Sequence, residues 1–156
     1  RLITTYGRSS EAQAAGRAVL AFRQVIARTL EARVHGKAVD PRTLEQINDA
    51  LCACGCTREL VADAKGYRMR PVFDIRKPAD VLIPLAHSIA EVLMSVDPTR
   101  IKQCREPRCT CYFIDTSKNR TRTWCSMQRC GNRQKVANYY RRTHVAVLTD
   151  ARRAGS

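Results

Sequence analysis

The sequence predicts an α+β protein that is mainly α-helical, with a small β-hairpin in its N-terminal part and a four-cysteine metal module that ends in a basic helix. Three observations support this prediction. Apolar residues recur at helical spacing through most of the first hundred positions. Two equally spaced cysteine pairs follow, and the positive charge is concentrated after them. We therefore expect two units, residues 1–98 and 99–156.

The first helix is predicted from Ser10 to about residue 32. Ser10 is a suitable N-cap, because its hydroxyl can accept an N–H of the first turn. The apolar positions fall at spacings of three and four and so form one stripe: Ala15, Ala18, Val19, Phe22, Val25, Ile26 and Leu30.

A second helix is predicted to begin at Asp40-Pro41, a capping residue followed by proline at the first helical position, and to end at Gly55. Residues 59–62 and 67–74 then alternate around a Lys65-Gly66 turn, which predicts a β-hairpin.

A third helix is predicted over residues 78–95, with an apolar stripe that packs against the first helix. The apolar stretch that contains it, 81–96, is interrupted by Pro84, His87 and Glu91. It is therefore shorter than the roughly 20 apolar residues that a membrane-spanning helix needs. We expect a protein without membrane contact, and Asp97-Pro98 marks the boundary between the two units.

The C-terminal cysteines form two matched pairs, Cys104-x₄-Cys109 and Cys125-x₄-Cys130, separated by fifteen residues. Two short loops that each present a pair of thiolates suit a single tetrahedral Zn²⁺ ion. The alternatives are disulfides or free structural thiols. We predict one structural zinc ion with these four ligands.

Between the pairs, residues 111–114 and 121–124 are predicted as two short strands, joined by a turn at 115–120. A helix over about 133–147 follows, with Asn132 as its cap. We expect a positive φ at Gly131, which would turn backbone N–H groups toward the thiolates.

Residues 104–142 resemble the CGNR-type zinc finger, named for the run Cys130-Gly131-Asn132-Arg133. The resemblance also includes Phe113, Asp115, Ser117 and Trp124. In that family the finger follows an N-terminal ABATE domain, which residues 1–98 resemble more loosely, and relatives generally have more residues before the position of Arg1. The resemblance implies a stress-induced transcription regulator of bacteria. The order of a ligand pair, a hairpin, a second ligand pair and a closing helix resembles a treble-clef finger. Relatives usually carry an aromatic or aliphatic residue where this chain has Cys111, and the equal spacing favours Cys109 as the ligand.

Charge indicates the class of partner. Residues 101–156 carry 13 basic and 3 acidic side chains, a net charge of +10, whereas residues 1–100 carry only +4. A concentrated basic surface favours phosphate-rich partners. We expect DNA to be bound through its phosphate backbone and major groove by Lys118, Arg120, Arg122, Arg133, Lys135, Asn138, Arg141 and Arg142.

Several positions have a structural alternative. Arg133 could pair with Asp115 inside the finger. Tyr139 and Tyr140 are expected to pack rather than stack on bases. The helical stripe formed by Val136, Tyr140, Thr143 and Val147 is expected to face the finger or the first unit.

The remaining cysteines and histidines do not predict catalysis. Cys52, Cys54 and Cys56 lack a fourth partner and are expected to be small buried apolar side chains, and His87 a packing residue. The sequence contains no HExxH, glycine-rich phosphate loop or nucleophile elbow, and a four-cysteine zinc site is closed, so we expect no enzyme.

The leading functional hypothesis is a DNA-binding transcription regulator of the bacterial cytoplasm, associated with the nucleoid, because eight cysteines suit a reducing compartment. The N-terminal domain is expected to sense a small-molecule or protein effector or to form a homodimer. The alternatives are a zinc-stabilised protein-interaction module and an RNA-binding protein.

Overall fold

The computed structural model describes residues 9–53, 56–64 and 66–153, with side chains as far as residue 143. The chain forms two compact units, Arg1–Pro98 and Thr99–Ser156, which are described in turn. Within the described ranges, no helix is long and apolar enough to cross a lipid bilayer.

Helix α2 (Ser10–Val34) follows the predicted stripe. Ser9, one residue before the expected cap, accepts the N–H of Ala12 at 3.1 Å. Thr29 lies among the buried apolar residues of the stripe, and its hydroxyl is satisfied by donation to the Val25 carbonyl at 2.9 Å. The helix ends at Val34, and Gly36, two residues later, has a φ of +66°, a left-handed conformation that glycine adopts without strain.

Helix α3 (Pro41–Cys52) begins as predicted. The Asp40 carboxylate accepts the Thr43 N–H at 3.0 Å. Hydrogen bonds from the hydroxyl and the N–H of Thr43 lower the pKa of Asp40 below its usual value. The expected end at Gly55 lies outside the described residues, and α3 ends at Cys52. Cys52 is exposed, so the prediction that it is buried was wrong. The buried positions of α3 are occupied by Thr43, Ile47 and Ala50. The side chains of Cys54 and Cys56 lie outside the described part.

Strands β1 (Cys56–Asp63) and β2 (Gly66–Phe73) form the predicted antiparallel hairpin, in which Leu60 pairs with Met69 and Ala62 with Tyr67. Every described side chain of the hairpin is exposed or half-buried. Two ion pairs join its strands, Arg70–Glu59 and Arg68–Asp63.

The third predicted helix is present as a 3₁₀ turn, η1 (Pro78–Val81), followed by α4 (Leu82–Ser95). Asp80 is buried and accepts the backbone N–H groups of Lys77 and Arg76, each at 3.0 Å. These bonds, led by that from Lys77, lower the pKa of Asp80. His87 on α4 is half-buried, with its ring 5.0 Å from that of Phe73, as expected for a packing residue.

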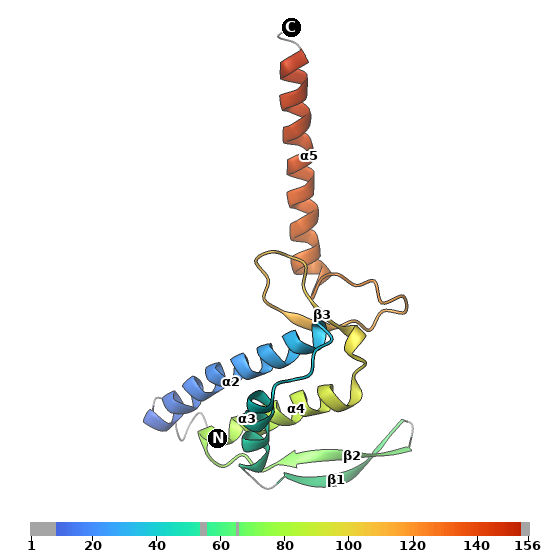
Figure 1. The fold of residues 1–156 in the computed structure, drawn as a ribbon. Coiled ribbons are helices and arrows are strands. Elements are labelled where there is room, and N and C mark those ends of the chain that lie inside the picture. The colour runs from blue at the N-terminus through green and yellow to red at the C-terminus, as the bar shows by residue number, and fades with distance from the viewer. Residues whose placement is uncertain (1–8, 54–55, 65, 154–156) are drawn as a thin grey trace. The chain divides into compact units, whose positions relative to one another are not determined.

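The three helices of the N-terminal unit enclose one apolar core, and Figure 1 shows α3 and α4 side by side with α2. Each helix contributes two buried residues to this core: Phe22 and Val25 from α2, Ile47 and Ala50 from α3, and Ala86 and Ile89 from α4.

The C-terminal unit follows a short 3₁₀ turn, η2 (Pro98–Arg100), and contains β3 (Ile101–Gln103), β4 (Tyr112–Ile114), η3 (Met127–Gly131) and α5 (Asn132–Arg153). Strands β3 and β4 pair antiparallel, with Lys102 opposite Phe113. The hairpin therefore encloses the first cysteine pair. In Figure 1, α5 continues from this unit as a single unbroken helix.

The prediction of a strand at 121–124 was wrong. The backbone there bonds to groups outside any ladder: the Thr123 carbonyl accepts the Arg105 N–H at 3.1 Å, and the Arg122 N–H donates to the Asp115 carboxylate at 3.0 Å. The Asn132 cap was also wrong. Ser126 caps η3, which runs directly into α5, and Asn132 already has helical dihedral angles.

The core predicts a contrast between two positions of α3. Ile47 is 2% exposed and Leu44 is 40% exposed. Ile47→Ala should lower the free energy of unfolding by about 2–5 kcal/mol, because it leaves a cavity at the contact of three helices. Leu44→Ala, the matched control, should cost less than about 1 kcal/mol. Urea unfolding followed by circular dichroism measures both, and equal losses would contradict the described packing.

Candidate metal centre and basic surface

Four thiols converge in the C-terminal unit. The Sγ atoms of Cys104, Cys109, Cys125 and Cys130 all lie within 4.8 Å of one another. Cys109 and Cys125 are 3.7 Å apart, and Cys125 and Cys130 are 3.6 Å apart. A tetrahedron with Zn–S bonds of about 2.3 Å has edges of about 3.8 Å. The sulfur positions therefore fit one Zn²⁺ ion, and they are too far apart for disulfides.

Backbone N–H groups support the thiols. The Cys125 N–H donates to the Cys104 Sγ at 3.4 Å. A backbone hydrogen bond from Cys111 lowers the pKa of the Cys109 thiol to about 7. The pKa of the Cys125 thiol is raised by burial, and burial also raises that of Cys130. Buried thiols close together resist deprotonation unless a cation neutralises them, which a divalent metal does.

Cys111 lies beside this cluster but outside it. It is exposed, whereas Cys104 and Cys130 are buried, and its Sγ is not among the four that converge. Its carbonyl accepts the Cys104 N–H at 2.9 Å across the hairpin. The structure thus brings together the four cysteines selected by the equal spacing.

Gly131 serves a purpose other than the expected one. Its φ is outside the left-handed region, so the prediction of a positive φ was wrong. A Cβ atom there would lie 3.2 Å from Cδ1 of Trp124 and 2.3 Å from Sδ of Met127. The glycine after the fourth cysteine therefore allows Trp124 and Met127 to approach the start of α5.

Glu106 joins the first cysteine loop to α5. It is only 2% exposed, and its carboxylate accepts the Arg108 N–H at 3.1 Å and a guanidinium N–H of Arg133 at 3.2 Å. The expected pairing of Arg133 with Asp115 was wrong. Arg133 forms its ion pair with Glu106, and Asp115 forms one with Lys102. Sequence reasoning did not single out Glu106; its position between two ligands was the available signal.

Asp115 organises the loop between the cysteine pairs. It is fully buried and accepts hydrogen bonds from Lys102 Nζ at 2.6 Å, from the hydroxyl of Ser117 at 2.5 Å and from its N–H at 2.9 Å. These bonds, led by that from the Lys102 ammonium, hold the pKa of Asp115 well below its ordinary range. The ionised Asp115 carboxylate therefore stabilises the folded loop through these hydrogen bonds.

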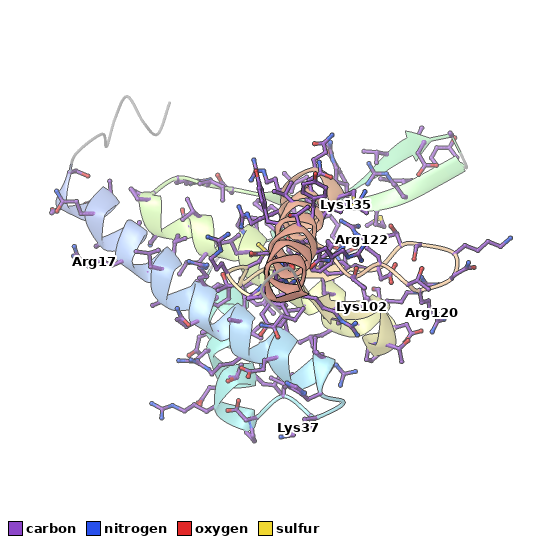
Figure 2. All side chains as sticks on the ribbon, turned by 90° about the horizontal axis from the view of Figure 1, so that it is seen from above. Arg17, Lys37, Lys102, Arg120, Arg122 and Lys135 are labelled. Carbon is purple, nitrogen blue, oxygen red and sulfur yellow. The ribbon has the colours of Figure 1, made fainter. Side chains whose placement is uncertain are left out.

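The predicted DNA-contacting residues divide into two groups. One group has internal contacts. Arg122 lies 4.8 Å from the centre of the Phe113 ring and donates to the Trp124 carbonyl, Arg120 donates to Thr99, Arg133 pairs with Glu106, and Arg141 donates to Asn138. Figure 2 shows Lys102, Arg120 and Arg122 on the loop side of the unit and Lys135 on α5.

The second group consists of exposed cations whose side chains make no hydrogen bond or ion pair with another described residue. It contains three predicted residues, Lys118, Lys135 and Arg142, and two that sequence reasoning missed, Arg105 and Arg129. Their only sequence signal was that they flank the cysteine pairs.

A helical domain followed by a module of four converging thiols defines a two-part protein with a candidate metal centre among its described residues. The family model of the CGNR zinc finger matches residues 100–143. The ABATE model, described as "Putative stress-induced transcription regulator", matches residues 2–96. The chain therefore belongs to the ABATE family and carries a CGNR zinc finger. No curated protein matches the chain.

The Glu106–Arg133 pair predicts a measurable coupling. Glu106→Gln should destabilise the finger by about 1–3 kcal/mol, because it weakens charged hydrogen bonds in a buried setting. Arg133→Gln should have a similar effect, and the double variant should lose less than the sum. Unfolding of the zinc-loaded chain in urea, followed by Trp124 fluorescence, measures all three. Strict additivity would show that the pair contributes no coupling.

Asp115 predicts a pH dependence. Its folded-state pKa is depressed, so its stabilisation is present above the unfolded value of about 3.9 and is lost only as pH falls toward the folded value. The stability difference between the parent and Asp115→Asn should thus be constant from pH 8 to about 5 and should shrink below about pH 4. Thermal unfolding across this range tests it, and a difference that vanished already at pH 6 would contradict the prediction.

Proposed function

We propose that the protein is a bacterial DNA-binding transcription regulator whose finger, held by one structural zinc ion, presents α5 to DNA. The observation that carries this proposal is the set of exposed cations without internal partners on and around the finger. The proposal also rests on membership of the ABATE family.

The metal has a structural role in this proposal. Four thiolates fill a tetrahedral coordination sphere and leave no position for water or substrate. The four cysteines supply the ligands, and bound zinc would provide the charge that holds the two loops together. We therefore assign no enzymatic activity to the centre.

The distribution of charge favours a polyanion. Buried acids neutralise Lys102 and Arg133, so these two cations serve the fold. Lys118, Arg129, Lys135 and the others in the unpartnered group remain available for phosphates. Such contacts release counterions and provide sequence-independent affinity.

The shape of α5 suits the major groove. Its 22 residues give a length of about 33 Å, and a major groove admits an α-helix. Lys135 and Arg142 are seven positions apart, about two helical turns, and lie on one face. The same face carries Asn138, whose amide can read base edges.

We assign the sensing role to the N-terminal unit. A cavity of about 390 Å³ is lined by residues of α2 and of the start of α3, namely Arg28, Asp40, Arg42, Thr43 and Gln46. Arg28 already donates to Thr43 and Gln46, so the polar lining suits a small polar effector. The exposed Leu60, Met69 and Tyr67 of the hairpin suit contact with a second copy. We place the protein in the cytoplasm at the nucleoid, where its thiols stay reduced.

Removal of the free cations tests the proposal. Lys135→Ala and Arg142→Ala should each weaken binding to mixed genomic duplex DNA by about 1 kcal/mol and reduce the slope of log K against log salt by about 1. Arg17→Ala, an exposed position on α2 of the N-terminal unit, is the matched control and should change neither.

Fluorescence anisotropy over a salt series gives both quantities. If Arg17→Ala weakened binding as much as Arg142→Ala did, α5 would not be the reader. Binding that did not depend on salt would favour an acidic protein surface as the partner of the basic helix.

A further inference from the structure

Three large side chains of α5 are exposed, although Val136 and Tyr140 lie on the predicted inward stripe and both tyrosines were expected to pack. Val136 is 54% exposed, Tyr139 65% and Tyr140 58%. The expectation that Val136, Tyr140 and Thr143 pack against the finger was therefore wrong. The side chain of Val147 lies outside the described part. The half-buried residues of this part of α5 are Gln134 and Ala137, so the helix uses another face toward the finger.

These side chains form a row along the helix. Val136, Tyr139 and Thr143 occupy positions i, i+3 and i+7, which lie one above another on one face. The Thr143 hydroxyl donates to the carbonyls of Tyr139 at 3.0 Å and Tyr140 at 3.1 Å. Its methyl group therefore remains as the outward part. The Tyr140 ring meets that of Tyr139 edge to face, with centroids 5.9 Å apart, which restricts the orientation of Tyr139.

A cationic row lies beside the apolar one. Lys135 and Arg142 directly precede Val136 and Thr143 in the sequence, so their side chains lie about 100° from the apolar row around the helix axis. Neither side chain has a partner among the described residues. A second copy docked on the apolar row would bring like charges together, which opposes association. Duplex DNA instead offers phosphates for the cationic row and, on the floor of the adjacent groove, the apolar 5-methyl groups of thymine.

We propose that the apolar row of Val136, Tyr139 and Thr143 contacts thymine 5-methyl groups in the major groove, while Lys135 and Arg142 hold the neighbouring phosphates. This inference rests on the proposed function and adds to it the base feature that the finger reads. A preference for thymine-containing sites follows.

The experiment uses one set of genomic duplex fragments copied twice, once with thymine and once with uracil, which lacks only the 5-methyl group. The zinc-loaded full chain should bind the thymine set about fourfold more tightly for each methyl group buried. Competition between the two sets at a fixed salt concentration measures the ratio.

Variants at exposed positions identify the side chains responsible. Tyr139→Ser and Val136→Ser should each bring the ratio of the affinities for the thymine and uracil sets closer to 1. The dependence of binding on salt should stay that of the parent. Lys135→Ala, the matched control, should weaken binding to both sets equally and keep the preference. Protection of the four cysteines from a thiol reagent and an unchanged circular dichroism spectrum verify that each variant is folded.

The other outcomes are distinguishable. Salt-dependent binding of the parent without a thymine preference would overturn this inference and leave the proposed function standing. Absence of binding to both duplex sets would overturn the proposed function and the inference with it. Tighter binding to the same fragments as single strands would overturn the inference and indicate that the apolar row contacts single-stranded nucleic acid. A dimer in sedimentation that depends on Tyr139 would overturn it and indicate that the row contacts a second copy.

Discussion

The C-terminal unit depends on one constraint, the convergence of four thiols within 4.8 Å. Only a divalent cation makes such a cluster of thiolates favourable, and in return the cluster fixes two loops that have little apolar core of their own. Ile101 is the one fully buried apolar side chain, besides two of the cysteines, among the described residues of this unit. Metal binding therefore takes the place of a hydrophobic core here, whereas in the N-terminal unit packed helices suffice.

Two buried carboxylates extend the order imposed by the cysteines. Glu106 connects the first loop to Arg133 at the start of α5, and Asp115 gathers Lys102, Ser117 and the backbone of Arg122. Each carboxylate neutralises one cation, Arg133 or Lys102, and at the same time holds a segment of the chain in place. The cations that remain are carried by elements that these contacts hold in place. In the proposed function, this would reduce the entropy lost when DNA binds.

Much of this could be predicted from sequence, and the failures have physical reasons. The stripe through Phe22 and Val25 and the alternation in the hairpin strands are local patterns, and the cysteine spacing identified the thiols that converge. Strands of three residues carry no usable periodicity, which explains why the pairing of β3 with β4 was missed. Whether Arg133 pairs with Glu106 or with Asp115 depends on which carboxylate the tertiary fold brings close to it, and the sequence does not give that distance. The exposure of Tyr139 and Tyr140 depends on whether a neighbour exists, which an amphipathic pattern cannot reveal.

The most direct test of the account is the binding of the zinc-loaded chain to mixed genomic DNA fragments over a salt series, with a chelated sample beside it and the recovered fragments sequenced. The account predicts an affinity that falls with salt by a slope of about −0.9 per contacted phosphate, is lost on chelation and enriches particular sequences. Binding that survived chelation unchanged would contradict the claim that the metal-held finger is the reader of DNA.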